Sequence, residues 1–191
     1  IAEEPKIAKY IDLPIQHCND AILKAMNRRD TKAELLALLK KLREKIPGLV
    51  LRTSLICGLP GEGEAEFEEL CEFLEEQRIE RAGVFQYSPE EGTRAAEMPD
   101  PVSRREKQKW FDALCNAQNA ISAEKHAAYI GRTVRVLVEG ESDDADWPLS
   151  ARTEGNRLVR MKGDKALIGT FAKAKITDSN TWALYGEAVE E

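Results

Sequence analysis

The chain has 191 residues, of which 42% are hydrophobic and 32% charged, a mix typical of a globular protein and not of a disordered or fibrous one. Its apolar runs are short, such as Leu55-Ile56-Cys57, and a membrane-spanning helix needs ~20 apolar residues, so we expect no membrane association. The formal charge of −6 argues against nucleic-acid binding by the whole surface. The 4 cysteines form no Cys-x-x-Cys pair, so we predict free thiols in a cytoplasmic protein and no metal site.

The first 100 residues alternate between strand-like runs and amphipathic helical patterns, which predicts an α/β fold with a parallel sheet. Strands are expected at 10–15, 49–57 and 81–87, with helices between them. One of these helices begins at a capping box formed by Thr31 and Glu34 and ends at Pro47-Gly48.

A second capping box, Ser103-x-x-Glu106, opens a long helix that we expect to reach about Tyr129. Beyond it the pattern predicts four short alternating strands at 134–138, 157–161, 169–176 and 182–189, with a solvated acidic loop at 141–146. These strands predict a small antiparallel β-barrel, and the chain then has two domains, 1–130 and 131–191.

Three segments directly follow predicted parallel strands, and the carboxyl ends of such strands meet at one edge of a sheet. The segments are Leu13-Pro14-Ile15-Gln16-His17, Gly58-Leu59-Pro60-Gly61-Glu62 and Tyr87-Ser88-Pro89-Glu90-Glu91-Gly92-Thr93. Gln16 and His17 offer hydrogen-bonding groups, and Gly61, expected at positive φ, would let a ligand approach the backbone. Each residue also has a purely structural interpretation. His17 could form a structural hydrogen bond, Glu62 could be the acidic residue at the start of a helix, and Glu90 and Glu91 could simply be solvated.

In their order and spacing, over about 90 residues, the three segments resemble the radical-SAM methylthiotransferase family. The sequence around Gln16-His17-Cys18 is similar to that of the RimO type, which acts on an aspartate of a small-subunit ribosomal protein. The tRNA-modifying MiaB type typically has Gln-Ser-Gly there. The resemblance implies that residues 1–130 are the C-terminal part of a TIM-like (βα) barrel.

Residues 131–191 resemble the TRAM domain that ends both types. Here Leu149-Ser150-Ala151-Arg152-Thr153-Glu154-Gly155-Asn156-Arg157 and Ile168-Gly169-Thr170-Phe171 are more similar to the tRNA-modifying type. Residues 152–175 also hold seven basic side chains against two acidic ones, as a phosphate-binding surface would need. A tRNA substrate therefore stays open as an alternative, beside a merely solvated charged face.

The resemblance implies S-adenosyl-L-methionine (SAM) as cofactor and assigns residues to two groups. The cofactor group is Gln16, His17, Arg52, Ser54, Gly58, Gly61 and Glu62. The substrate group is Tyr87, Glu90, Arg152 and Arg157, and no catalytic residue is assigned.

The family also holds a [4Fe-4S] cluster on a Cys-x-x-x-Cys-x-x-Cys loop, which this sequence lacks. We therefore expect the clusters to be bound by an N-terminal part of a longer parent protein, and this chain alone to be inactive. A non-catalytic RNA- or protein-binding module is the third alternative, and the oligomeric state does not follow from the sequence.

Overall fold

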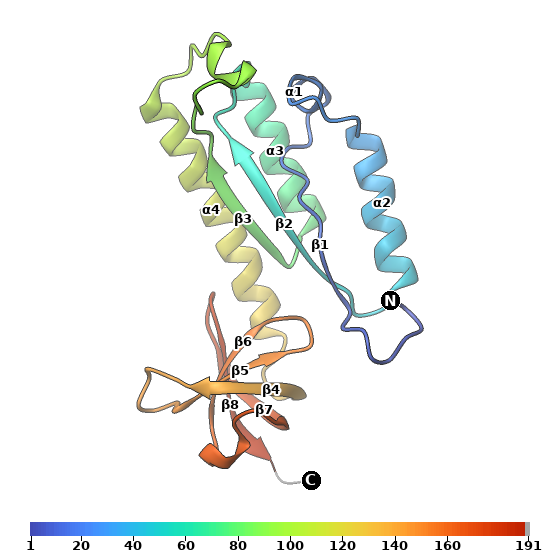
Figure 1. Cartoon of the computed structure of the whole chain (residues 1–191), viewed down its shortest axis with the longest axis vertical. Coiled ribbons are helices and arrows are strands. Elements are labelled where there is room, and N and C mark those ends of the chain that lie inside the picture. The colour runs from blue at the N-terminus through green and yellow to red at the C-terminus, as the bar shows by residue number, and fades with distance from the viewer. Residues whose placement is uncertain (190–191) are drawn as a thin grey trace. The chain divides into compact units, whose positions relative to one another are not determined.

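The computed structural model describes residues 1–189 and forms two compact units, one of Ile11–Ile121 and one of Ile1–Tyr10 with the residues from Ser122 onward. No helix in this described part is both long and apolar enough to cross a membrane. In chain order (Figure 1) the elements are β1 (Tyr10–Asp12), α1 (Asp20–Ala25), α2 (Lys32–Lys45), β2 (Val50–Cys57), α3 (Glu64–Gln77), β3 (Arg81–Gln86), η1 (Arg94–Glu97), α4 (Arg104–Ala127), β4 (Thr133–Glu141), β5 (Leu149–Thr153), β6 (Leu158–Lys162), η2 (Lys165–Leu167), β7 (Phe171–Ser179) and β8 (Leu184–Val189).

The first unit is built on a sheet with the strand order β1-β2-β3. β2 and β3 are parallel, with Arg52 opposite Arg81, and Gln16 forms a parallel bridge to Leu55. This confirms the predicted α/β fold of parallel strands, as in part of a (βα) barrel. β1 is shorter than expected because the N–H of Ile15 donates to the Thr53 hydroxyl at 3.1 Å, and Gln16 donates to the Ser54 carbonyl in its place.

One face of this sheet is covered by helices. Along β2, Leu51, Thr53 and Leu55 are buried while Arg52 and Ser54 between them are half-exposed, as expected when successive side chains point to opposite faces. The buried side packs against apolar stripes of three helices, whose core members are Leu35, Leu39, Leu70, Phe73, Leu74, Trp110 and Leu114. The capping box at Thr31 and Glu34 is present, so α2 begins where the sequence predicted.

The second unit contains a closed barrel with the strand order β4-β5-β6-β8-β7. Its core is small and apolar and includes Val136, Leu149, Met161 and Ile176. The barrel was predicted, but one of its strands, β5, was not. With five strands in a ring, directions cannot alternate all the way round, so one neighbouring pair must be parallel. That pair is β6 and β8, and the barrel is therefore mixed instead of wholly antiparallel.

Candidate functional site

The three motif segments come together at the carboxyl edge of the sheet. The N–H of Gln16 donates to the carbonyl of Ser54 at 2.8 Å, and the Gln16 carbonyl accepts from the N–H of Ile56 at 2.7 Å. On the other side of β2, the N–H of Tyr87 donates to the carbonyl of Cys57 at 2.8 Å. Gln16 and Tyr87 thus flank the end of β2, from which the Gly58 turn continues, and the segments converge as the sequence predicted.

Gln16 has the left-handed backbone conformation, with φ 73°. Residues other than glycine rarely adopt it, and such strain concentrates at functional sites. Here it accompanies the isolated bridge to Leu55 and leads the chain to a buried His17.

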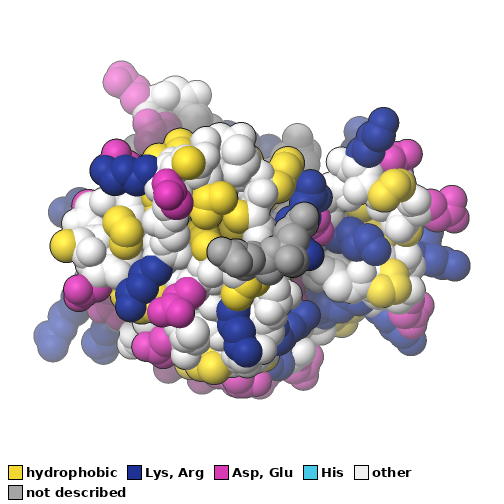
Figure 2. Space-filling model, turned by 90° about the horizontal axis from the view of Figure 1, so that it is seen from below, with side chains coloured by type: hydrophobic (Ala, Val, Ile, Leu, Met, Phe, Trp, Pro, Cys, Tyr) yellow, Lys and Arg dark blue, Asp and Glu magenta, His cyan; other side chains and the backbone are white. Residues whose placement is uncertain are grey.

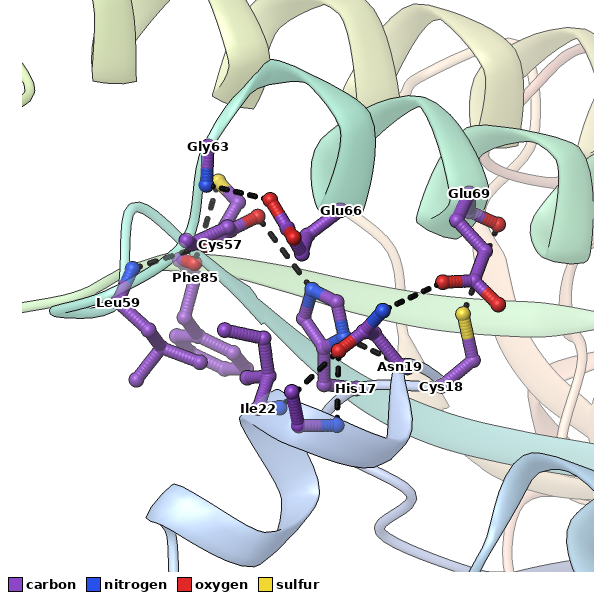
Figure 3. A network of polar contacts seen from close by, with 12 residues as sticks. His17, Cys18, Asn19, Ile22, Cys57, Leu59, Gly63, Glu66, Glu69 and Phe85 are labelled. Atoms are coloured by element: carbon purple, nitrogen blue, oxygen red, sulfur yellow. Dashed lines mark hydrogen bonds and ion pairs between the residues drawn. The ribbon is translucent and has the colours of Figure 1, made fainter.

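His17 forms a fully buried pair with Glu62, and Figure 3 labels His17 and marks its polar contacts with dashed lines. Its Nε2 lies 3.4 Å from Glu62 Oε1, and its Nδ1 accepts the N–H of Asn19 at 3.0 Å. Because Nδ1 is an acceptor, the ring proton is on Nε2 and is donated to the carboxylate. The other carboxylate oxygen accepts the N–H of Leu59 at 2.8 Å. The His17 imidazole and the Glu62 carboxylate therefore both hold the Gly58 turn against the end of β1.

The uncovered face of the sheet carries the other predicted cofactor residues. Arg52 and Ser54 both lie on it, and Arg52 forms an ion pair with Asp12 of β1. On β3, Gly83 is opposite Ser54, and the neighbouring Phe85 is 53% exposed. The face therefore combines hydrogen-bonding groups with an aromatic ring, which suits a ligand that has both polar and flat apolar parts.

Gly58 and Gly61 both have positive φ, at 77° and 86°, which confirms the prediction for Gly61. A side chain on Gly61 would meet no atom within 4 Å, whereas a Cβ on Gly58 would lie 2.8 Å from Cδ of Lys107. Gly58 is thus required twice, for its conformation and for its contact with Lys107.

Lys107, on α4, connects the loops of this site. Only 8% of its side chain is exposed, its Nζ lies 5.5 Å from the centre of the Tyr87 ring, and it forms an ion pair with Asp100. It also lines a pocket of about 330 Å³ together with Gln86, Tyr87, Ser88, Pro89, Asp100, Val102 and Arg104. Glu90 is exposed and is not among these lining residues.

The two predicted barrel residues have different surroundings. Arg152 bonds to the carboxylate of Glu139 at 3.1 Å and to the side chain of Asn156 at 3.2 Å. Arg157 is only 3% exposed and lies over the ring of Tyr129, 5.3 Å from its centre. The Arg152 side chain is paired but 38% exposed, so a partner can reach it, whereas Arg157 is largely enclosed.

The positive charge predicted for residues 152–175 is balanced in the fold by acids from other segments. Four of its basic residues form ion pairs outside the segment: Arg152 with Glu139, Arg160 with Asp143, Lys162 with Glu187 and Lys165 with Glu141. On the face of the molecule shown in Figure 2, Lys and Arg side chains lie beside Asp and Glu side chains, with hydrophobic side chains between them. The acidic loop expected to be solvated thus supplies partners for this segment.

All four cysteines are free, as predicted. Burial raises the pKa of the Cys18 and Cys57 thiols to about 12 and that of Cys71 to about 11, which keeps them protonated at neutral pH. Within residues 1–189, no group of three or more His, Cys, Asp or Glu side chains is arranged to hold a metal ion.

Two family models match the chain: the Radical SAM superfamily over residues 1–74 and the TRAM domain over residues 127–189. The ribosomal protein uS12 methylthiotransferase RimO of Anaeromyxobacter sp. (strain K) is 46% identical over 99% of this chain and 41% of that protein. The chain is thus similar, over nearly its whole length, to part of a protein named as a methylthiotransferase. The RimO protein of Geobacter sulfurreducens is 44% identical over 99% of the chain and 43% of that protein.

A tRNA-2-methylthio-N(6)-dimethylallyladenosine synthase from Alkaliphilus oremlandii is 40% identical over 100% of the chain and 41% of that protein. The chain therefore spans less than half the length of each of these relatives.

The sequence did not single out Lys107. Its position offered one signal: a lysine in the first turn of a helix is disfavoured by the helix dipole. In the structure, Asp100 and the Tyr87 ring offset that cost.

Proposed function

We propose that this chain is the C-terminal part of a RimO-type radical-SAM methylthiotransferase, which adds a methylthio group to an aspartate of ribosomal protein uS12. The observation that carries the proposal is the convergence of Gln16, the Gly58 turn and Tyr87 at one edge of the sheet. The names of the most similar relatives support it. A cytoplasmic location, where ribosomes are assembled, and a domain boundary near residues 130 and 131 are parts of the same proposal.

The uncovered sheet face fits SAM as a cofactor. Arg52 and Ser54 would bind its polar groups, the Gly58 and Gly61 turn would leave room beside its adenosine, and Gln16 would lie near its ribose. Bound SAM would supply the carbon radical and the methyl group of the reaction, whereas the inserted sulfur would come from a source outside this chain. The residues present do not fit an iron–sulfur cluster, so its thiolates would come from a part of the parent protein outside this sequence.

His17 and Glu62 act in this proposal by positioning. Their buried pair fixes the Gly58 turn relative to the end of β1, where the cofactor would lie. Tyr87 and Glu90 would face the substrate, Arg152 would contact it from the barrel, and the enclosed Arg157 would support that surface from within.

The test is made in the full-length parent enzyme, with uS12 analysed by mass spectrometry for methylthio-aspartate. Arg52→Met should reduce the modified fraction at least tenfold, because it removes a charged contact to the cofactor. Arg29→Met, a change at an exposed arginine, is the matched control and should leave the modified fraction unchanged. Unmodified uS12 in a strain with the wild-type enzyme would contradict the proposal.

A tRNA substrate is the second candidate, favoured by the basic residues of the barrel and by the tRNA-modifying relative. The ion pairs of Arg152, Arg160, Lys162 and Lys165 reduce the charge available for phosphates. A gel shift of unmodified tRNA with this chain, repeated at increasing salt, distinguishes the tRNA candidate from the ribosomal-protein candidate. Strong binding that weakens steeply with salt would favour the tRNA candidate.

A third reading, a non-catalytic binding module, predicts that the full-length parent cleaves no SAM. The mass-spectrometric assay on uS12 therefore also separates it from the proposed enzyme.

A further inference from the structure

The pocket between the end of β3 and the start of α4 contains buried polar atoms without partners. Gln86 Nε2 and the Tyr87 hydroxyl are both buried and have no hydrogen-bond partner among the residues that the structure describes. Both residues line the pocket. A buried donor left unpaired destabilises the fold, so two such atoms in the lining of one pocket indicate that something else completes the site.

The groups around the pocket are mainly hydrogen-bond donors. Gln86 Nε2 only donates, the Tyr87 hydroxyl can donate, and Arg104 and Lys107 add two cationic donors. The carboxylate of Asp100 is already bound to Lys107. A ligand that only accepts hydrogen bonds matches this set, and an ionised carboxylate is the acceptor-only group of protein side chains.

The charges of the pocket also favour a carboxylate ligand. Lys107 and Arg104 are positive and Asp100 is negative, so these lining side chains carry one net positive charge. One carboxylate would neutralise it. The volume of about 330 Å³ leaves space for the rest of a short acidic side chain and its backbone.

We propose that this pocket binds the carboxylate of an aspartate side chain, with Gln86 and Tyr87 as donors and Arg104 and Lys107 as the balancing charges. That this aspartate is the residue to be modified rests on the proposed function, whereas the preference of the pocket for a carboxylate does not. Lys107 acts as a positioning residue, because it contacts both the Gly58 turn and the Tyr87 ring.

The experiment titrates the 191-residue chain, labelled with ¹⁵N on its glutamine side chains, with N-acetyl-aspartate N-methylamide. The side-chain amide signals of Gln86 should shift and saturate. The asparagine derivative, which has the same shape without the charge, should bind at least about tenfold more weakly. Equal binding of the two derivatives, or shifts that spare Gln86, would overturn the proposal.

Two substitutions then remove one donor each. Gln86→Met and Tyr87→Phe should each weaken binding of the aspartate derivative about tenfold, because each deletes a hydrogen bond to a charged group. Isothermal titration calorimetry measures these affinities, since Gln86→Met removes the amide signal. Gln108→Met, at an exposed position of α4, is the control and should leave the affinity unchanged. If both donor variants bind as tightly as the wild type, the assignment of the donors is wrong.

A competition arm tests the other ligand that such a pocket would accept. Adenosine should not displace the aspartate derivative from Gln86, and displacement would assign the pocket to a nucleoside and overturn the proposal. The arms also separate this inference from the proposed function. Aspartate binding without any methylthio transfer to uS12 by the full-length enzyme would leave the pocket standing and contradict the proposed function alone.

Discussion

The imidazole of His17 lies 3.4 Å from the carboxylate of Glu62, across 45 residues of sequence, and both side chains are fully buried. A buried polar pair of this kind is costly to break, because the remaining partner is left without a hydrogen bond. The buried His17–Glu62 pair should therefore contribute to the stability of the fold whether or not a ligand is bound.

His17→Leu should lower the free energy of unfolding by about 2–4 kcal/mol, because it leaves Glu62 Oε1 buried and unpaired. Urea unfolding followed by the helical circular dichroism signal measures the change. Glu68→Ala, at an exposed position of α3, should stay within about 0.5 kcal/mol of the wild type. A fully stable His17→Leu variant would mean that His17 serves a ligand and not the fold.

Lys32 and Glu69 predict a pH-dependent contribution to stability. The hydrogen bond from Lys32, 2.8 Å long, holds the pKa of the Glu69 carboxyl below its ordinary value of 4.5. Because the folded-state pKa is the lower one, this contribution is present above pH 4.5 and is lost as the pH falls through the folded value.

Lys32→Met should therefore cost about 0.5–1 kcal/mol near neutral pH, since the pair is partly exposed, and the cost should disappear in strong acid. Urea midpoints of both proteins across acid pH test this. A difference that stays constant with pH would show that Lys32 stabilises by packing alone.

The two glycines of the turn should respond differently to alanine. Gly61→Ala should cost about 1–2 kcal/mol from backbone strain alone, because no atom lies within 4 Å of the added Cβ. Gly58→Ala adds the contact with Lys107 at 2.8 Å and should cost about 1 kcal/mol more. A double-mutant cycle with Lys107→Ala should recover part of the additional cost, and strict additivity would contradict the contact.

The raised thiol pKa values predict slow alkylation in the folded chain. At pH 8, Cys18 and Cys57 should stay unmodified by iodoacetamide, since burial raises the pKa of both thiols to about 12 and shields them. Both should react readily in urea. Peptide mass spectrometry gives the modified fraction at each cysteine, and rapid native labelling of Cys57 would contradict its burial.

The sequence predicted the parallel sheet and the capped helices because those features depend on local patterns. The strand β5 was missed since its inward positions are Leu149 and Ala151, and alanine gives too weak an apolar signal. The parallel pairing of β6 with β8 could not be read locally either, because it depends on how many strands close the ring.

In the candidate site, the sequence identified the segments that meet but not the contacts within them. The Glu62 partner of His17 and the Asp100 and Tyr87 neighbours of Lys107 depend on tertiary folding. The basic segment 152–175 shows the same limit, since four of its charges are balanced by acids that lie outside it in sequence.

The position of β8 between β6 and β7 makes the integrity of the barrel depend on a single hairpin. A proteolytic cut after Ser179 that released β8 would leave β6 and β7 each with an open row of N–H and carbonyl groups. Such edges recruit strands from other molecules, so clipped chains would be prone to aggregate and be removed by cellular quality control. The integrity of that hairpin would then determine how long the molecule persists in the cell.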